Sequence, residues 1–142
     1  MTASTVHTSL SASARTEPAA WLPFVGRLGI AAIFILSGIS KVAAPAYSIA
    51  YIESAGLPFA PLALAAAALV EIVGGALLVL GYRTRFIAAV LALFALVTAI
   101  VFHAHFADQN QFIHFFKNIA MAGGLAQIVA FGAGGLSLDA RR

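Results

Sequence analysis

Residues 61–81, PLALAAAALVEIVGGALLVLG, form an apolar run with a single charged side chain, Glu71, at its midpoint. An α-helix needs about 20 such residues to cross the roughly 30 Å hydrocarbon core of a membrane. Strands of a membrane β-barrel would be about 10 residues long and would alternate between polar and apolar side chains, which this run does not. The stretch therefore predicts a membrane-spanning helix that carries a carboxylate near the middle of the bilayer.

Three other apolar segments have a similar length: residues 21–44, 85–106 and 115–136. The whole 142-residue chain is 62% hydrophobic and only 9% charged, with a mean hydropathy of +0.99. A soluble domain has about 25% charged residues, so the charges here are too few to cover a water-facing surface. Lipid offers no partners for free backbone groups, which excludes irregular spans. The predicted fold class is all-α: an integral membrane bundle of four transmembrane helices, with the lipid bilayer as its partner.

The composition also excludes several classes of function. The chain has no cysteine, which excludes disulfides, thiolate catalysis and thiolate metal ligation by its own residues. Its net charge is +3, but the basic residues are scattered singly and form no stripe with interleaved aromatics. Nucleic acid is therefore not an expected partner.

The transmembrane domain is expected to occupy residues 21–138. Residues 1–20 are rich in Ser, Thr and Ala and lack the apolar region of about 7–15 residues that a cleavable signal peptide needs. They are expected to form a flexible cytoplasmic tail. Residues 45–60 connect the first two spans and contain Pro45, Gly56 and Pro58, which break helix continuation. Residues 107–114 join the last two spans, and residues 139–142 form a basic C-terminal tail.

The positions of the basic residues predict the orientation of the bundle. An even number of spans places both termini and the turn at residues 81–85 on one side of the membrane. That side contains Arg15, Arg83, Arg85, Arg141 and Arg142. The other side has only Lys41 and Lys117, together with Glu53 and Asp108. Since basic residues are enriched in cytoplasmic loops, both termini are expected to lie in the cytoplasm.

Several polar side chains fall within or at the edges of the apolar segments. A charge at the bilayer centre costs about 2.5–3.5 kcal/mol on insertion scales, so such residues usually face a bundle interior. Glu71 has two interpretations: a packed ion pair with Arg27 or Lys41, or a carboxylate that carries a proton or binds a ligand. For Lys41 and Lys117 the alternative is snorkelling to the outer headgroups. The candidate polar cluster consists of Arg27, Lys41, Glu71, His103, Lys117 and Asn118.

The histidines do not have the spacing of a metal site. His103 and His105 are two residues apart, so on a helix they point to nearly opposite faces and cannot chelate one ion together. No pair of histidines is spaced at i, i+4, as in helical zinc motifs. No metal is expected, and polar aromatic residues at the water interface are the simpler interpretation.

Four segments carry a resemblance to a known family: RLGIAAIFILSGISKVAAP (27–45), EIVGGALLVLGYRTR (71–85), FH (102–103) and FFKNIAMAGGL (115–125). In this combination the chain resembles the DoxX family of small four-helix bacterial membrane proteins, over residues 27–139. The signature positions that the resemblance implies are Arg27, Gly38, Lys41, Glu71, Gly74, Gly75, Arg85, His103, Lys117 and Asn118.

The resemblance implies a multi-pass protein of the bacterial cytoplasmic (inner) membrane. It also implies a membrane component or partner of a quinone-linked redox or oxidative-stress system. The chain has no Fe–S motif and no dinucleotide fingerprint. An enzymatic role is therefore that of an accessory subunit, with soluble or membrane redox proteins carrying the electrons. The alternative is a non-enzymatic membrane anchor, an assembly factor or a small-molecule transporter.

A quinone is the one cofactor that the sequence accommodates. Lys41, His103, Lys117 and Asn118 are expected around an outward-facing mouth, with Glu71 below them beside Gly74 and Gly75, which would open a cavity. Lysine, histidine and asparagine supply donors for the quinone carbonyl oxygens. The apolar walls are assigned to Phe102, Phe106, Phe115 and Phe116. The competing interpretation of these residues is an ordinary hydrated rim of helix ends.

Overall fold

The computed structural model describes residues 18–142, with side chains from residue 21 onward. Most of the predicted N-terminal tail, residues 1–17, lies outside this part. The elements are α1 (Pro18–Ala43), α2 (Pro45–Ser54), α3 (Ala60–Leu80), α4 (Thr84–Phe102), α5 (Gln109–Phe131) and a short 3₁₀ helix, η1 (Asp139–Arg141). Residues 18–142 contain no strand. Four of the helices, α1, α3, α4 and α5, are long and apolar enough to cross a membrane, which confirms the predicted all-α, four-span fold.

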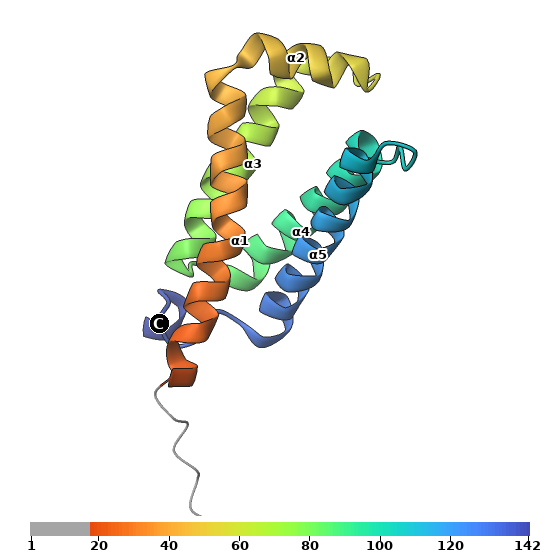
Figure 1. Ribbon diagram of the computed structural model, residues 1–142. Helices are drawn as coiled ribbons and strands as arrows, with labels where there is room; N and C mark the ends of the chain where they lie inside the picture. The colour runs from red at the N-terminus through yellow and green to blue at the C-terminus, as the bar shows by residue number, and fades with distance from the viewer. Residues whose placement is uncertain (1–17) are drawn as a thin grey trace, which may run out of the picture.

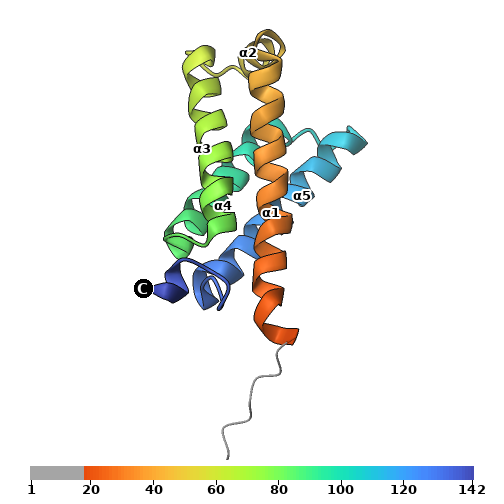
Figure 2. The ribbon, with the colours of Figure 1, turned by 90° about the vertical axis from the view of Figure 1, so that its left-hand side faces the viewer.

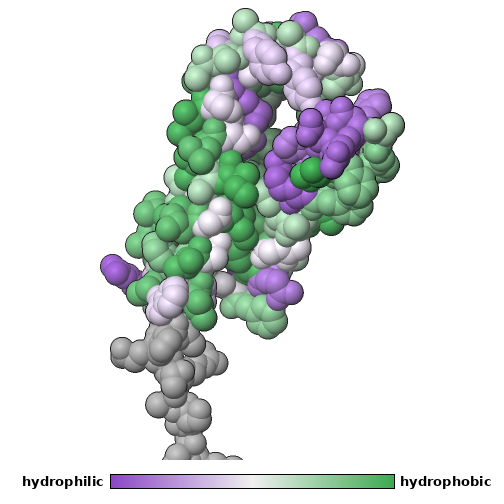
Figure 3. Space-filling model, viewed as in Figure 1, coloured by the Kyte–Doolittle hydropathy of each residue, from purple (hydrophilic) through white to green (hydrophobic). Residues whose placement is uncertain are grey.

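The four spans form two helical hairpins arranged as a V (Figure 1). Helix α1 packs along α3, and α4 packs along α5. The hairpins meet at the end that holds the C-terminus, here called the base, and diverge toward the end that holds α2, here called the open end (Figure 1). Figure 2 shows α1 and α3 side by side, in front of α4 and α5. The flanks of the V are mostly apolar, whereas polar residues gather near the open end (Figure 3). This distribution suits a protein whose sides face lipid.

Glycines allow the helices of the V to approach closely. A Cβ atom on Gly38 of α1 would lie 2.6 Å from Cγ1 of Ile72, and one on Gly75 of α3 would lie 2.7 Å from Cγ1 of Ile35. Small residues at such contacts are the usual means of packing helices in lipid, where no hydrophobic effect drives them together. Gly74 similarly faces Leu91 of α4, at 3.0 Å from its Cδ2. The expectation that Gly74 and Gly75 open a cavity was wrong, because neighbouring side chains fill the space beside both.

At the base, a buried arginine connects α1 to the end of α3 and to the segment that follows α5. Arg27 of α1 is only 1% exposed, and its guanidinium donates hydrogen bonds to the carbonyls of Leu78, Val79 and Leu136. The last carbonyls of a helix have no partner within that helix, so Arg27 satisfies two of them at the end of α3. Gly81, which follows α3, has a φ of +67°, and a side chain there would collide with the Arg27 guanidinium.

The C-terminal segment returns to the turn between α3 and α4. The carboxylate of Asp139 accepts hydrogen bonds from the backbone N–H of Arg83 at 2.8 Å and from the N–H and hydroxyl of Thr84, both at 2.7 Å. Backbone bonds from Leu138 to Leu80 and from Asp139 to Gly81 add to this contact. Asp139 thus caps α4, whose first N–H groups need acceptors. Residues 137–141, here called the C-terminal strap, are therefore docked rather than a free tail.

Three helix boundaries differ clearly from the prediction. Helix α4 ends at Phe102 rather than at residue 106. Helix α5 begins at Gln109 instead of residue 115, because Asp108 caps it by accepting from the N–H groups of Asn110 and Gln111. It ends at Phe131 rather than 136, where Gly132 takes a positive φ. Helix α2 was not predicted: Pro45 ends α1 but stands in the first turn of α2, a position that tolerates its missing N–H.

Candidate functional site

A cleft of about 680 Å³ lies between the two hairpins, toward the open end. All five α-helices contribute to its lining, and most of the lining side chains are apolar. Figure 3 shows a hollow between the α2 region and the ends of α4 and α5. The cleft exists because the hairpins are held together at the base and diverge above it.

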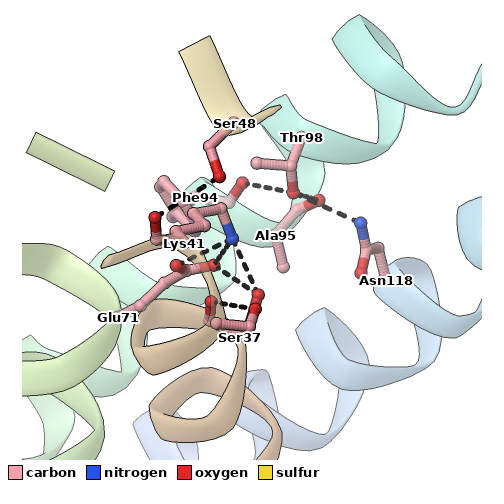
Figure 4. Close-up of polar contacts among 9 residues, drawn as sticks. Ser37, Lys41, Ser48, Glu71, Phe94, Ala95, Thr98 and Asn118 are labelled. Carbon is pink, nitrogen blue, oxygen red and sulfur yellow. Dashed lines mark hydrogen bonds and ion pairs between the residues drawn. The ribbon is translucent and has the colours of Figure 1, made fainter. Parts of the chain in front are cut away.

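One wall carries an ion pair. Nζ of Lys41 lies 2.9 Å from both carboxylate oxygens of Glu71 and donates to Oγ of Ser37 at 2.7 Å. The Ser37 hydroxyl donates to Glu71 at 3.1 Å, which closes a three-residue network between α1 and α3 (Figure 4). The Glu71 side chain is 5% exposed, and that of Lys41 is 29% exposed. The pair is neutral as a unit, which lowers the cost of keeping both charges within the membrane.

The opposite wall carries an amide. Asn118 of α5 is 6% exposed, and its Nδ2 donates to Oγ1 of Thr98 on α4 at 3.2 Å (Figure 4). The Thr98 hydroxyl is engaged with the carbonyls of Phe94 and Ala95 in its own helix, so it serves Asn118 as an acceptor. This contact orients the amide, and Asn118 is part of the cleft lining.

His103 and Lys117 lie where the cleft reaches the ends of α4 and α5. Both belong to the lining. The Nδ1 atom of His103 is 2.7 Å from Oε1 of Gln111, and the ring of His114 lies 5.2 Å from the His103 ring. Nζ of Lys117 is 3.3 Å from Nδ1 of His114. These groups form a polar edge beside the buried Asn118.

Helix α2 covers part of the open end. The Tyr51 ring stacks on Phe102 of α4 with 5.5 Å between centroids, and its hydroxyl donates to the Phe102 carbonyl at 3.4 Å. Phe102 also packs against a small cluster of Ile52, Ala60 and Leu64. These contacts join the two hairpins near the open end on the side of α3 and α4.

The structure brings together five of the six residues of the predicted polar cluster. The lining of the cleft includes Lys41, Glu71, His103, Lys117 and Asn118. Arg27 lies at the base instead, where it binds backbone carbonyls. Glu71 pairs with Lys41, one of the two partners considered for it.

The aromatic walls were assigned incorrectly in part. Of the four phenylalanines predicted, Phe102 lines the cleft. Phe106, Phe115 and Phe116 form an edge-to-face cluster with Phe112 beside the α4–α5 loop. Phe34 and Phe94 line the cleft instead. Phe34 had a signal, because it precedes Lys41 by seven residues and so shares its helix face. Phe94 had none, because no charged residue lies one or two turns from it.

Sequence reasoning also missed Ser37, Thr98 and Tyr51. Ser37 had a signal, because it precedes Lys41 by four residues and so shares its helix face. Thr98 and Tyr51 act across helix boundaries, which the sequence pattern does not reveal. Within residues 18–142, no three His, Asp or Glu side chains are grouped closely enough to hold a metal ion.

The arrangement resembles a ligand site more than a packing defect. Ligand sites are concave, mostly apolar and carry a few convergent polar groups, and this cleft has donors on two facing walls. Its chemistry is hydrogen bonding and charge compensation, with Glu71 as the one carboxylate in its lining.

Comparison with known proteins agrees with this architecture. The DoxX family model matches residues 22–104, which span α1 to the end of α4. The chain is 32% identical to the inner membrane protein YphA of Escherichia coli K12 over 126 residues, covering 84% of this chain and 89% of that protein. It is 34% identical to the inner membrane protein YqjF of the same organism over 115 residues, covering 81% and 87%. No solved structure matches the chain. Given this match and its four spans, the chain is a multi-pass inner membrane protein that belongs to the DoxX family.

Proposed function

We propose that this protein is the membrane component of a quinone-linked redox system and binds a quinone headgroup in the cleft between its hairpins. The observation that carries the proposal is the ion pair of Lys41 and Glu71, which is held inside the membrane domain at the wall of a cleft. Ionisable residues within spans are expensive and usually mark a functional site. A purely structural pair would be buried between α1 and α3, whereas Lys41 is 29% exposed beside the cleft.

The residues fit a quinone in size and chemistry. The cleft volume of about 680 Å³ lies within the roughly 300–1,000 Å³ of typical small-molecule sites. A quinone ring presents two carbonyl oxygens that need donors and an apolar face that needs hydrocarbon. Lys41 and Asn118 place donors on facing walls, and Phe34 and Phe94 supply apolar surface. When bound, the quinone would carry electrons through the membrane.

The chain's own residues would bind and orient the ring. The three N–H groups of the Lys41 ammonium are used by Ser37 and Glu71, and the one on Ser37 would turn to a quinone carbonyl while Glu71 keeps the charge compensated. The Asn118 amide, fixed by Thr98, would donate from the other wall. His103 lies at the polar edge of the cleft, where Oε1 of Gln111 fixes the position of its ring. Electrons would come from or go to soluble or membrane redox proteins.

We further propose that the base faces the cytoplasm. The basic residues of the turn before α4, of the first turn of α4 and of the C-terminus gather there: Arg83, Arg85, Arg141 and Arg142. Lys117 and Lys41 lie toward the open end, where Glu53 and Asp108 are also located. This charge asymmetry follows the rule for cytoplasmic loops, and it would turn the cleft toward the outer side of the inner membrane.

Quinone binding by purified protein in nanodiscs tests the proposed function. The probe is 2,3-dimethoxy-5-methyl-1,4-benzoquinone, measured with the wild-type protein, Lys41→Gln and Asn118→Leu. Loss of one hydrogen bond costs about 0.5–1.5 kcal/mol, so each variant should bind about 2- to 10-fold more weakly. Ile39→Ala, on the exposed face of α1, is the matched control and should bind as the wild type does. Equal binding by all four proteins, or none by any, would contradict the proposal and favour an anchoring, assembly or transport role.

A further inference from the structure

We propose that the ligand carries a hydrocarbon tail, and that this tail lies in a groove between α3 and α4 that continues from the cleft toward the base. This inference rests on the proposed function: the headgroup would bind in the cleft, and the tail would lie in the groove. The groove has a volume of about 170 Å³. All of its lining residues are apolar or glycine: Leu69, Val70, Val73, Gly74, Leu77, Phe86, Ile87, Val90 and Leu91.

The groove and the cleft share a wall. Val70 lines both of them, and it directly precedes Glu71 in α3. On α3 the cleft is lined by Ala63, Ala66, Ala67, Val70 and Glu71, and the groove continues through Val73, Gly74 and Leu77. These positions recur every three or four residues, so they form one stripe along a single helix face. The ion pair therefore lies near the junction between the cleft, which carries the polar groups, and the groove, which carries none.

Helix α4 presents the matching stripe. Its cleft residues are Phe94, Ala95, Val97, Thr98 and Phe102, and its groove residues are Phe86, Ile87, Val90 and Leu91. Gly74 belongs to the groove lining on the α3 side, where Leu91 packs closely against it, with Cδ2 at 3.0 Å from a Cβ placed there. The two stripes together make a continuous path along the α3–α4 interface.

The length and polarity of this path fit an amphiphile. From Val70 to Leu77 the groove follows α3 for about 10 Å at 1.5 Å per residue, which accommodates several carbons of a chain. Its outer edge opens to lipid, since Val73 and Phe86 are 45% and 66% exposed. A hydrocarbon chain gains little binding free energy by moving from lipid into such a groove. The groove would therefore position the tail, and the polar groups of the cleft would select the headgroup.

The opposite side of the V offers less room for a tail below the cleft. There α1 and α5 come together at Ile30 and Gly124, where a Cβ on Gly124 would lie 3.1 Å from Cδ1 of Ile30. The α3–α4 side is therefore the path that the structure favours.

Photolabelling tests the assignment. The probe is the same benzoquinone with a decyl tail that ends in a diazirine, added to protein in nanodiscs. Wild-type protein should be labelled at groove residues of α3 and α4, and an excess of the decyl quinone without diazirine should suppress that labelling. Val90→Trp fills the groove and should reduce the suppressible labelling by at least about fivefold. Leu93→Trp, exposed to lipid on the same helix and outside both hollows, should leave it within about twofold.

Each outcome has a distinct meaning. Binding of the tailless benzoquinone should be the same in Val90→Trp and wild type, which shows that the variant is folded and that its cleft is intact. Labelling that excess quinone does not suppress is ordinary labelling from the lipid phase and overturns the inference. Suppressible labelling located outside the groove, or unaffected by Val90→Trp, overturns it too while leaving the proposed function standing. Failure of the wild type to bind either quinone overturns both.

Discussion

Lys41 and Glu71, thirty residues apart in the chain, meet with 2.9 Å between the ammonium nitrogen and each carboxylate oxygen. The contact joins α1 to α3 within one hairpin, one turn above the close approach at Gly75 and Ile35. Each charge is tolerable in the membrane because the other is present. Removing one charge should therefore lower the free energy of unfolding by more than the intact pair contributes to it.

Glu71→Gln should destabilise the protein because it leaves the Lys41 charge without its counter-ion. Breaking a buried pair costs about 3–5 kcal/mol, and the lower end applies here since Lys41 is 29% exposed. Thermal unfolding in detergent measures the change. Adding Lys41→Met should restore part of the stability, and Glu53→Gln, at an exposed position of α2, should have no measurable effect. A double variant as unstable as Glu71→Gln alone would argue against the pair.

Arg27→Leu should weaken the base of the V. The change leaves the carbonyls of Leu78, Val79 and Leu136 without the guanidinium that they share. Hydrogen bonds to a charged group contribute about 1.5–3 kcal/mol each, so the free energy of unfolding should fall by at least that amount. Arg141→Leu removes an exposed arginine near the same end and should change the unfolding temperature little. Equal stability of the two variants would show that the Arg27 contacts contribute nothing.

Asp139→Asn should loosen the C-terminal strap and the start of α4. The hydrogen bonds from the Thr84 hydroxyl and backbone N–H hold the pKa of Asp139 below its ordinary value of 3.8. A depressed pKa in the folded protein stabilises it at pH values above 3.8, and that contribution is lost as the pH falls through the folded pKa. Loss of a helix cap costs about 0.5–2 kcal/mol. Unfolding measured from pH 7 down to pH 3 should show a gap between wild type and variant that narrows toward the acid end.

Cysteine labelling tests the orientation. Single cysteines at Glu53 and Gln109, both exposed at the open end, should react in intact cells with a thiol reagent that does not cross the inner membrane. A cysteine at Ala140, exposed at the base, should react only after the membrane is permeabilised. Labelling of Ala140→Cys in intact cells would reverse the proposed topology.

The four spans were predictable because length and apolarity alone decide them. The pairing of Glu71 with a basic residue was also predictable, since lipid leaves a buried charge few alternatives. The choice between Arg27 and Lys41 was not. It depends on the register of α1 against α3, which places Gly38 beside Glu71 and Arg27 beside the Leu78 carbonyl at the base.

Contacts between distant segments account for the other differences. Asp139 caps α4 only because the C-terminal strap folds back to Thr84, 55 residues earlier in the chain. No local sequence pattern predicts that contact. In the sequence, Gly74 and Gly75 are equally compatible with a cavity and with a close helix contact. Only the positions of the Leu91 and Ile35 side chains, which pack against them, show that they form helix contacts. Helix α2 was not predicted, because a proline that ends one helix can also stand in the first turn of the next.

The divergence of the two hairpins (Figure 1) would give the protein unequal cross-sectional areas in the two leaflets. It is narrow at the base and broad at the open end, so it acts as a wedge among the lipids. The outer leaflet of a small vesicle has more area than the inner one, and the broad end fits there with less disturbance of lipid packing. Reconstitution into small vesicles should therefore favour one orientation, with Glu53→Cys reactive from outside, and this bias should fade as the vesicles become larger and their leaflets more nearly equal.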